Sequence, residues 1–128
     1  MNIIYKSAFA LALSCSGIMA AQAHIPLKAK NHILIDEKGM TVYTFDKDTA
    51  GDGKSTCYQD CAALWPAVKA DKADAAVSAK GDYSLITRTD GTQQWAYKGK
   101  PLYLFSKDKK AGDRLGDNVK DIWHVVSQ

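Results

Sequence analysis

One segment of this chain occurs twice and decides its fold. The first copy, residues 39–48, reads GMTVYTFDKD, and the second copy, residues 99–108, reads GKPLYLFSKD. Glycine, tyrosine, phenylalanine, lysine and aspartate recur at the same positions. An Ala-Gly-Asp tripeptide follows each copy, at residues 50–52 and 111–113, and each half later reaches a tryptophan, Trp65 or Trp123. The repetition predicts two related halves, at about residues 32–66 and 92–126, related by a pseudo-two-fold axis.

Each copy has the pattern of a β-strand that follows a turn. Tyr43 and Phe45 lie two residues apart, so both rings share one face of a strand, and Tyr103 and Phe105 repeat this arrangement. Further strands are expected on both sides of these segments. They comprise residues 33–35 and 93–97 as hairpin partners, residues 85–88 before an Asp-Gly turn, and residues 122–126 as a last strand.

Asp48 and Asp108 close the two copies, at the point where each strand ends. A carboxylate in this position commonly accepts hydrogen bonds from backbone N–H groups of its own loop, and we expect this role for both residues. The alternative is a calcium loop built on Asp46, Asp48 and Asp52. Ala50 replaces an expected ligand there, and no glutamate closes the twelve-residue frame.

Residues 57–65 have the signals of a short helix. Thr56 to Gln59 matches a capping box, and Cys57, Cys61 and Trp65 recur at helical spacing. Pro66 ends the pattern. Residues 67–80 are rich in alanine and lysine with little periodicity, which indicates a surface connection. The expected fold is therefore mainly β with one short helix, an internally duplicated, pseudo-two-fold β-hairpin or meander domain.

Length and composition agree with a single domain of this kind. The chain has 128 residues, of which 46% are hydrophobic and 24% charged, enough for one modest core. This composition excludes a collagen, a disordered acidic tail and a polytopic membrane protein. The 17 basic and 14 acidic residues leave a net charge of +3. That surplus is too small to indicate nucleic-acid binding, and the chain contains no motif that reads DNA or RNA.

Residues 1–23 have the three-part pattern of a secretory signal peptide. Lys6 precedes an uncharged apolar run, and Ala21-Gln22-Ala23 is a small-x-small cleavage site. We therefore expect a mature domain at residues 24–128, in the periplasm or outside the cell. Lipid anchoring at Cys15 is the competing interpretation, but the usual leucine three positions before the cysteine is missing.

Cys57 and Cys61 are the two cysteines left after cleavage. An even pair in an exported protein favours one disulfide, and one helical turn brings the two Cα atoms to about 6 Å. The alternative is a redox-active pair or a thiol–metal site, although the spacing is not the Cys-x-x-Cys of thioredoxin-like proteins.

The motifs together resemble a family, the bacterial secreted-repeat proteins, also described as predicted lipoproteins with a Tyr-x-aromatic-x-x-Asp motif. The matching residues begin with Tyr43 to Asp48 and Tyr103 to Asp108. They continue with Cys57, with Cys61 to Pro66, with Asp90 to Trp95 and with Pro101 to Tyr103. The resemblance covers about residues 32–125. It implies the fold and an extracytoplasmic location, and it implies no established activity.

The sequence leaves the activity open between classes. Serine-hydrolase, zinc-protease and phosphate-loop motifs are absent, so no catalytic residue, cofactor or metal is predicted. We expect a non-catalytic binding or accessory domain with an envelope protein or a small molecule as its partner. A redox or electron-transfer accessory that uses Cys57 and Cys61 is the alternative, as is a periplasmic metal-binding protein with His24, His32 or His124 as ligands. The tryptophans and the Tyr-x-Phe pairs are expected in the core, with an exposed aromatic patch as the other possibility.

Overall fold

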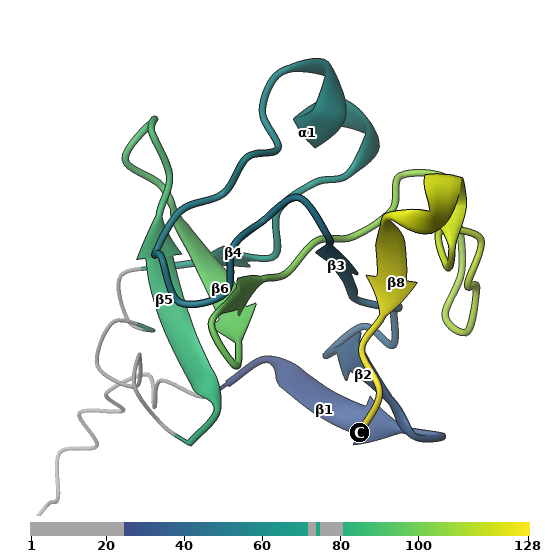
Figure 1. The fold of residues 1–128 in the computed structure, drawn as a ribbon. Coiled ribbons are helices and arrows are strands. Elements are labelled where there is room, and N and C mark those ends of the chain that lie inside the picture. Colours follow the sequence, from purple (N-terminus) through teal and green to yellow (C-terminus); the bar gives the residue numbers. More distant parts are fainter. Residues whose placement is uncertain (1–24, 72–73, 75–80) are drawn as a thin grey trace, which may run out of the picture.

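The computed structural model of the protein describes residues 25–71, 74 and 81–128. The predicted signal peptide, Cys15, His24 and part of the 67–80 connection lie outside these residues. The described elements are β1 (Leu27–Lys30), β2 (Ile33–Asp36), β3 (Tyr43–Phe45), α1 (Asp60–Leu64), β4 (Lys69–Ala70), β5 (Tyr83–Thr87), β6 (Gln93–Tyr97), β7 (Lys100–Pro101), the 3-10 helix η2 (Val119–Asp121) and β8 (Trp123–Val125). The chain is mainly β with one short α-helix in the described part, as the sequence predicted (Figure 1).

Each half contains an antiparallel hairpin, formed by β1 and β2 in the first half and by β5 and β6 in the second. The strand that ends each half crosses over to the other half. β4 pairs with β6, and β8 pairs with β3. Figure 1 shows β8 beside β3 although the two strands are far apart in the sequence. The two halves therefore exchange their last strands reciprocally.

The two copies of the repeated segment meet at the centre of the molecule. Tyr43 donates its backbone N–H to the Tyr103 carbonyl at 2.8 Å, and Tyr103 donates to the Tyr43 carbonyl at 2.9 Å. This reciprocal pair is antiparallel. Such an arrangement is what a two-fold axis between two equivalent strands produces.

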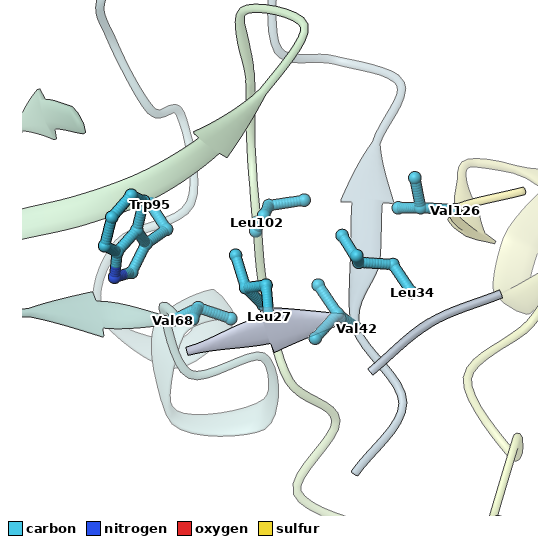
Figure 2. Packing of buried hydrophobic residues seen from close by; sticks show 7 residues of the cluster. All are labelled: Leu27, Leu34, Val42, Val68, Trp95, Leu102 and Val126. Carbon is cyan, nitrogen blue, oxygen red and sulfur yellow. The ribbon is translucent and has the colours of Figure 1, made fainter. Parts of the chain in front are cut away.

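Two hydrophobic clusters lie on opposite sides of this central pair, because successive side chains of a strand point to opposite faces. Val42 and Leu102 belong to one cluster, and the neighbouring Tyr43 and Tyr103 belong to the other. Figure 2 shows the first, aliphatic cluster, which takes residues from both halves: Leu27, Leu34, Val42, Val68, Trp95, Leu102 and Val126. The second cluster is almost entirely aromatic.

The helix is shorter than predicted. α1 begins at Asp60, and its N-terminus at Gln59 has no side-chain cap, so the predicted capping box is wrong. The hydroxyl of Thr56 donates to Asp48 Oδ1 at 2.6 Å instead of capping the helix. Cys57 lies outside the helix and is fully buried, whereas Leu64 is 38% exposed.

The structure contains two short strands that the sequence did not predict, β4 and β1. Residues 67–80 do not form a surface connection throughout, because Ala67 and Val68 are buried and the next two residues form β4. β1, at residues 27–30, was not predicted. β1 buries only Leu27 and β4 buries none of its side chains, so both short strands depend on pairing with a neighbouring strand.

Candidate functional site

The motif tyrosines and aspartates meet across the two halves. The hydroxyl of Tyr43 donates to Asp108 Oδ2 at 2.6 Å, and the hydroxyl of Tyr103 donates to Asp48 Oδ2 at 2.6 Å. All four residues are buried, with exposed fractions between 0% and 6%. Each carboxylate therefore bonds to the tyrosine of the other repeat and not to that of its own.

The second oxygen of each carboxylate holds its own loop. Asp48 Oδ1 accepts the backbone N–H of Thr56 at 2.8 Å, and Asp108 Oδ1 accepts that of Leu115 at 2.9 Å. This is the loop role that we expected from the sequence. The bond to the tyrosine hydroxyl was not expected, and it gives each aspartate a second, long-range function.

Both tyrosine hydroxyls also accept a bond. Tyr43 accepts the backbone N–H of Gly116 at 3.2 Å. The oxygen atoms of Tyr103 and Ser55 are 2.6 Å apart, and Ser55 is the donor because the Tyr103 proton is already given to Asp48. Burial, followed by the hydrogen bond to a carboxylate, raises the pKa of Tyr43 and of Tyr103 well above the ordinary value. Both side chains are therefore held as neutral phenols.

The repeated glycines are sites of close approach between the halves. A Cβ atom on Gly99 would lie 2.6 Å from the backbone nitrogen of Gly51, and one on Gly39 would lie 3.0 Å from Cβ of Ala111. Both glycines have positive φ, +80° at Gly99 and +84° at Gly39. The Ala-Gly-Asp loop of each repeat thus packs against the glycine that opens the motif of the other repeat.

Four aromatic rings form a continuous stack between the halves. Trp65 and Trp123 lie face to face, with ring centroids 3.8 Å apart and planes 2° apart. Phe45 stacks on the outer face of Trp123 at 4.0 Å, and Phe105 on that of Trp65 at 4.1 Å. Trp65 and Trp123 are each 3% exposed, so these rings belong to the core and form no exposed aromatic patch.

Arg88 is a buried cation that the sequence analysis missed. Its side chain is 6% exposed and donates to Ser55 Oγ at 3.1 Å, to Gln94 Oε1 at 2.7 Å and to the Cys57 carbonyl at 2.7 Å. Its guanidinium also lies 4.4 Å from the centroid of the Tyr58 ring. These acceptors compensate the desolvation of the charge. Arg88 lies two residues after the buried Ile86, and strand alternation could have placed both on the inner face.

The sequence motifs therefore build the contact between the halves. The polar atoms of the tyrosines and aspartates are paired with one another or with nearby backbone, and the glycines and tryptophans are covered by their counterparts. Groups that are buried and fully bonded in this way are not accessible to a ligand. A binding site must be sought elsewhere on the surface.

A cleft opens between α1 and η2, beside the ring stack. Its volume is about 360 Å³, and its apolar lining includes Leu64, Val119, Ile122, Trp65 and Trp123. The loops that carry α1 and η2 follow the two motif copies and differ in sequence between the repeats. The cleft is thus formed between loops whose sequences differ between the two repeats. It lies next to the core contacts that both repeats share.

Charged side chains surround the cleft. Lys47 and Lys120 lie at its rim with Asp60, and all three are exposed. Two ammonium groups and one carboxylate leave one positive charge in excess. The cleft therefore combines an apolar interior with a positively charged edge.

The disulfide lies beside this cleft. Cys57 and Cys61 are bonded, with Cα atoms 5.2 Å apart. Cys57 is fully buried, and its Sγ is 3.9 Å from the carbonyl oxygen of Trp65. Cys61 is half-buried and lines the cleft. The bond connects α1, which has no fully buried residue of its own, to the core.

A wider depression of about 680 Å³ lies between residues 36–40 and β4. Its border reaches Asp71 and Asp74. A third hollow, of about 230 Å³, lies between residues 30–41 and residues 111–114. The cleft between α1 and η2 differs from both because aromatic side chains line it.

The acidic loops do not gather as the calcium alternative requires. Among the described residues, no three His, Cys, Asp or Glu side chains come together as a metal site. Asp46 lies 2.8 Å from Nε2 of His124, and Asp52 accepts the backbone N–H of Lys54. Asp48 is buried and engaged with Thr56 and Tyr103, so these carboxylates serve separate contacts.

Fold and site together define a class of protein: a duplicated β-domain whose repeated motif joins its two halves and leaves a small cleft at their junction. Residues 29–69 and 84–127 match a family described as a secreted repeat of unknown function. The chain belongs to this family, as the motif resemblance implied, and the two matched segments are its two repeats. No curated protein and no solved structure matches the chain.

A membrane-spanning helix is absent from the described residues. None of the helices in that part of the chain has the length and the apolar character that a bilayer crossing needs.

Proposed function

We propose that this protein is a non-catalytic binding or accessory domain and that it binds its partner in the cleft between α1 and η2. The observation that carries the proposal is the contrast between motif and cleft. The motif residues are buried and paired with each other, whereas the cleft has an apolar lining with charged groups at its edge. Apolar concavities with a few polar groups are where proteins bind small ligands, and 360 Å³ lies within the usual size range.

A fragment screen by NMR tests this proposal. Small organic fragments should shift the amide signals of residues 60–64 and 119–123, which form the two walls of the cleft. Leu64→Gln should weaken these interactions because it places an amide in the apolar wall. Leu115→Gln is the matched control, since Leu115 is an exposed leucine that does not line the cleft. Fragments that bind elsewhere, or binding that is equally sensitive to both variants, would contradict the proposal.

We propose further that the domain acts after export, in the periplasm or outside the cell. The pattern of residues 1–23 and a disulfide between Cys57 and Cys61 support this location. The intact mass of the exported product should equal residues 24–128 minus two hydrogens. A measured mass that includes acyl chains on Cys15 would instead show that the protein is a lipoprotein.

A redox role is the second candidate, because Cys61 reaches the cleft surface. A dithiol could attack the disulfide there, so that two electrons and two protons yield two thiols while the dithiol becomes a disulfide. The reduction potential of the pair separates the candidates. A value below about −300 mV is typical of a structural bond, and a much higher value favours the redox role.

A further inference from the structure

The cleft exposes the edges of its tryptophans and not their faces. Trp123 is stacked between Phe45 and Trp65, and Trp65 is stacked between Trp123 and Phe105. Both faces of both indoles are therefore covered. Aromatic edges carry partial positive charge, whereas the faces that attract cations carry partial negative charge. A ligand in the cleft therefore meets the positive edge of each of the two indoles.

The indole nitrogens of the two cleft tryptophans are hydrogen-bond donors that the described residues do not use. A Cβ on the buried Gly116 would touch Cη2 and Cζ3 of Trp65, so the six-membered ring of Trp65 points inward. Within the described part of the chain, the indole nitrogens of Trp65 and Trp123 have no acceptor. These two nitrogen atoms are not fully buried. The indole nitrogen of Trp95, in contrast, is buried without a partner.

The rim has the same polarity as the ring edges. Lys47 follows β3 and Lys120 lies within η2, so the two halves each bring one ammonium group to the cleft. Asp60 brings one carboxylate, which leaves one positive charge in excess. Ring edges, N–H donors and lysines all favour a negatively charged group and disfavour a cation.

We propose that the cleft binds a small organic anion, whose charged group lies near Lys47 and Lys120 and whose apolar body contacts Leu64 and Ile122. This inference rests on the proposed binding function and adds the chemical class of the ligand. The class is an amphipathic anion such as a short-chain or aromatic carboxylate. The cleft volume of about 360 Å³ limits the ligand to a small molecule.

Three probes with the same apolar body test the class of ligand: octanoate, 1-octanol and octylammonium. Isothermal titration at low salt should give an octanoate affinity about ten-fold or more above those of the other two, since one charged hydrogen bond contributes about 1.4 kcal/mol or more. Lys47→Gln combined with Lys120→Gln should remove this preference. Lys28→Gln combined with Lys54→Gln lowers the net charge equally at exposed lysines outside the cleft and should leave the preference intact.

The outcomes separate this inference from the proposed function. If all three probes bind alike and Leu64→Gln weakens all of them, the cleft is a binding site but the anionic class is wrong. If octylammonium binds best, the class is likewise overturned. If octanoate binds and neither the Lys47/Lys120 pair nor Leu64→Gln weakens it, the site is wrong. If none of the three binds, the anion proposal fails, while the fragment screen still decides the binding function.

Discussion

Double-mutant cycles can test the cross-repeat pairing of tyrosine and aspartate. Asp108→Ala removes the acceptor of the buried Tyr43 hydroxyl and that of the Leu115 N–H. Each orphaned donor costs about 1–3 kcal/mol, so we expect the two together to lower the free energy of unfolding by about 2–6 kcal/mol. Tyr43→Phe leaves Oδ2 of the buried Asp108 and the N–H of Gly116 unpaired. We expect it to lower the free energy of unfolding by a similar amount.

The two substitutions share one interaction, so their effects should not add. We expect a coupling energy of about 1.5–3 kcal/mol for Tyr43 with Asp108, the usual contribution of a hydrogen bond to a charged group. The control cycle combines Tyr43→Phe with Asp48→Ala, which belongs to the same repeat and bonds to Tyr103 instead. Its coupling should stay within about 0.5 kcal/mol.

Asn at position 108 should recover only part of the loss. Its Oδ1 can still accept the Leu115 N–H, but its Nδ2 is a donor where the Tyr43 hydroxyl needs an acceptor. We therefore expect Asn to restore about 1 kcal/mol relative to Ala, less than a role confined to the loop would predict. A metal-binding role predicts a different result: the Asn variant would keep the full stability of the metal-free protein but would no longer bind the ion.

Urea denaturation at pH 7, with the disulfide intact, measures all these variants. The coupling energies follow from the unfolding free energies of the wild type, the single variants and the double variants. Coupling as large in the same-repeat cycle as in the cross-repeat cycle would refute the exchange of partners. Additive effects of Tyr43→Phe and Asp108→Ala would show that the hydroxyl–carboxylate bond contributes nothing to stability.

Three further predictions concern the same core. Stability should fall above pH 10, because Tyr43 and Tyr103 ionise at about pH 10 in the unfolded chain while their raised pKa keeps them protonated in the folded one. The slope is at most about 1.4 kcal/mol per pH unit for each tyrosine, and urea titrations from pH 9 to 11 should show a shallower slope when both are phenylalanine. Gly99→Ala should lower the free energy of unfolding by about 2–5 kcal/mol through positive φ and overpacking. Gly91 also has positive φ but has open space around it, so Gly91→Ala should cost only about 1–2 kcal/mol. Equal melting temperatures of the two variants would argue against close packing at Gly99. Finally, a protease site inserted between residues 76 and 77 allows the chain to be cut into two pieces. Because β4 pairs with β6 and β8 with β3, the two pieces should elute together in gel filtration. Pieces that separate in native buffer would contradict the exchange of strands.

Much of the fold could be predicted from local pattern. The alternation of Tyr43 and Phe45, the glycine turns and the Asp-Gly hairpin are properties of contiguous residues, and each gave an element that the structure contains. Prediction was weaker where the local signal was short. Thr56 matched a helix cap by residue type, yet its hydroxyl bonds to Asp48, because a buried carboxylate is the stronger partner.

The cleft could not be predicted from sequence. Its walls come from residues 60–64 and 119–123, which are distant in the chain. Strand alternation could have placed Arg88 on the inner face, but its hydrogen-bond partners could not be predicted. Its acceptors, among them Ser55 and Cys57, lie in another repeat, and no local pattern records them.

By itself, the sequence determined that this protein has two related halves and which residues repeat in them. Only the tertiary structure decided that Tyr43 bonds to Asp108 and Tyr103 to Asp48. The physical reason is that both repeats carry the same tyrosine and the same aspartate, so pairing within a repeat and pairing between repeats satisfy the same chemistry. The choice depends on the path of the chain, which brings the last strand of each half against the other half and closes the core across the pseudo-two-fold axis.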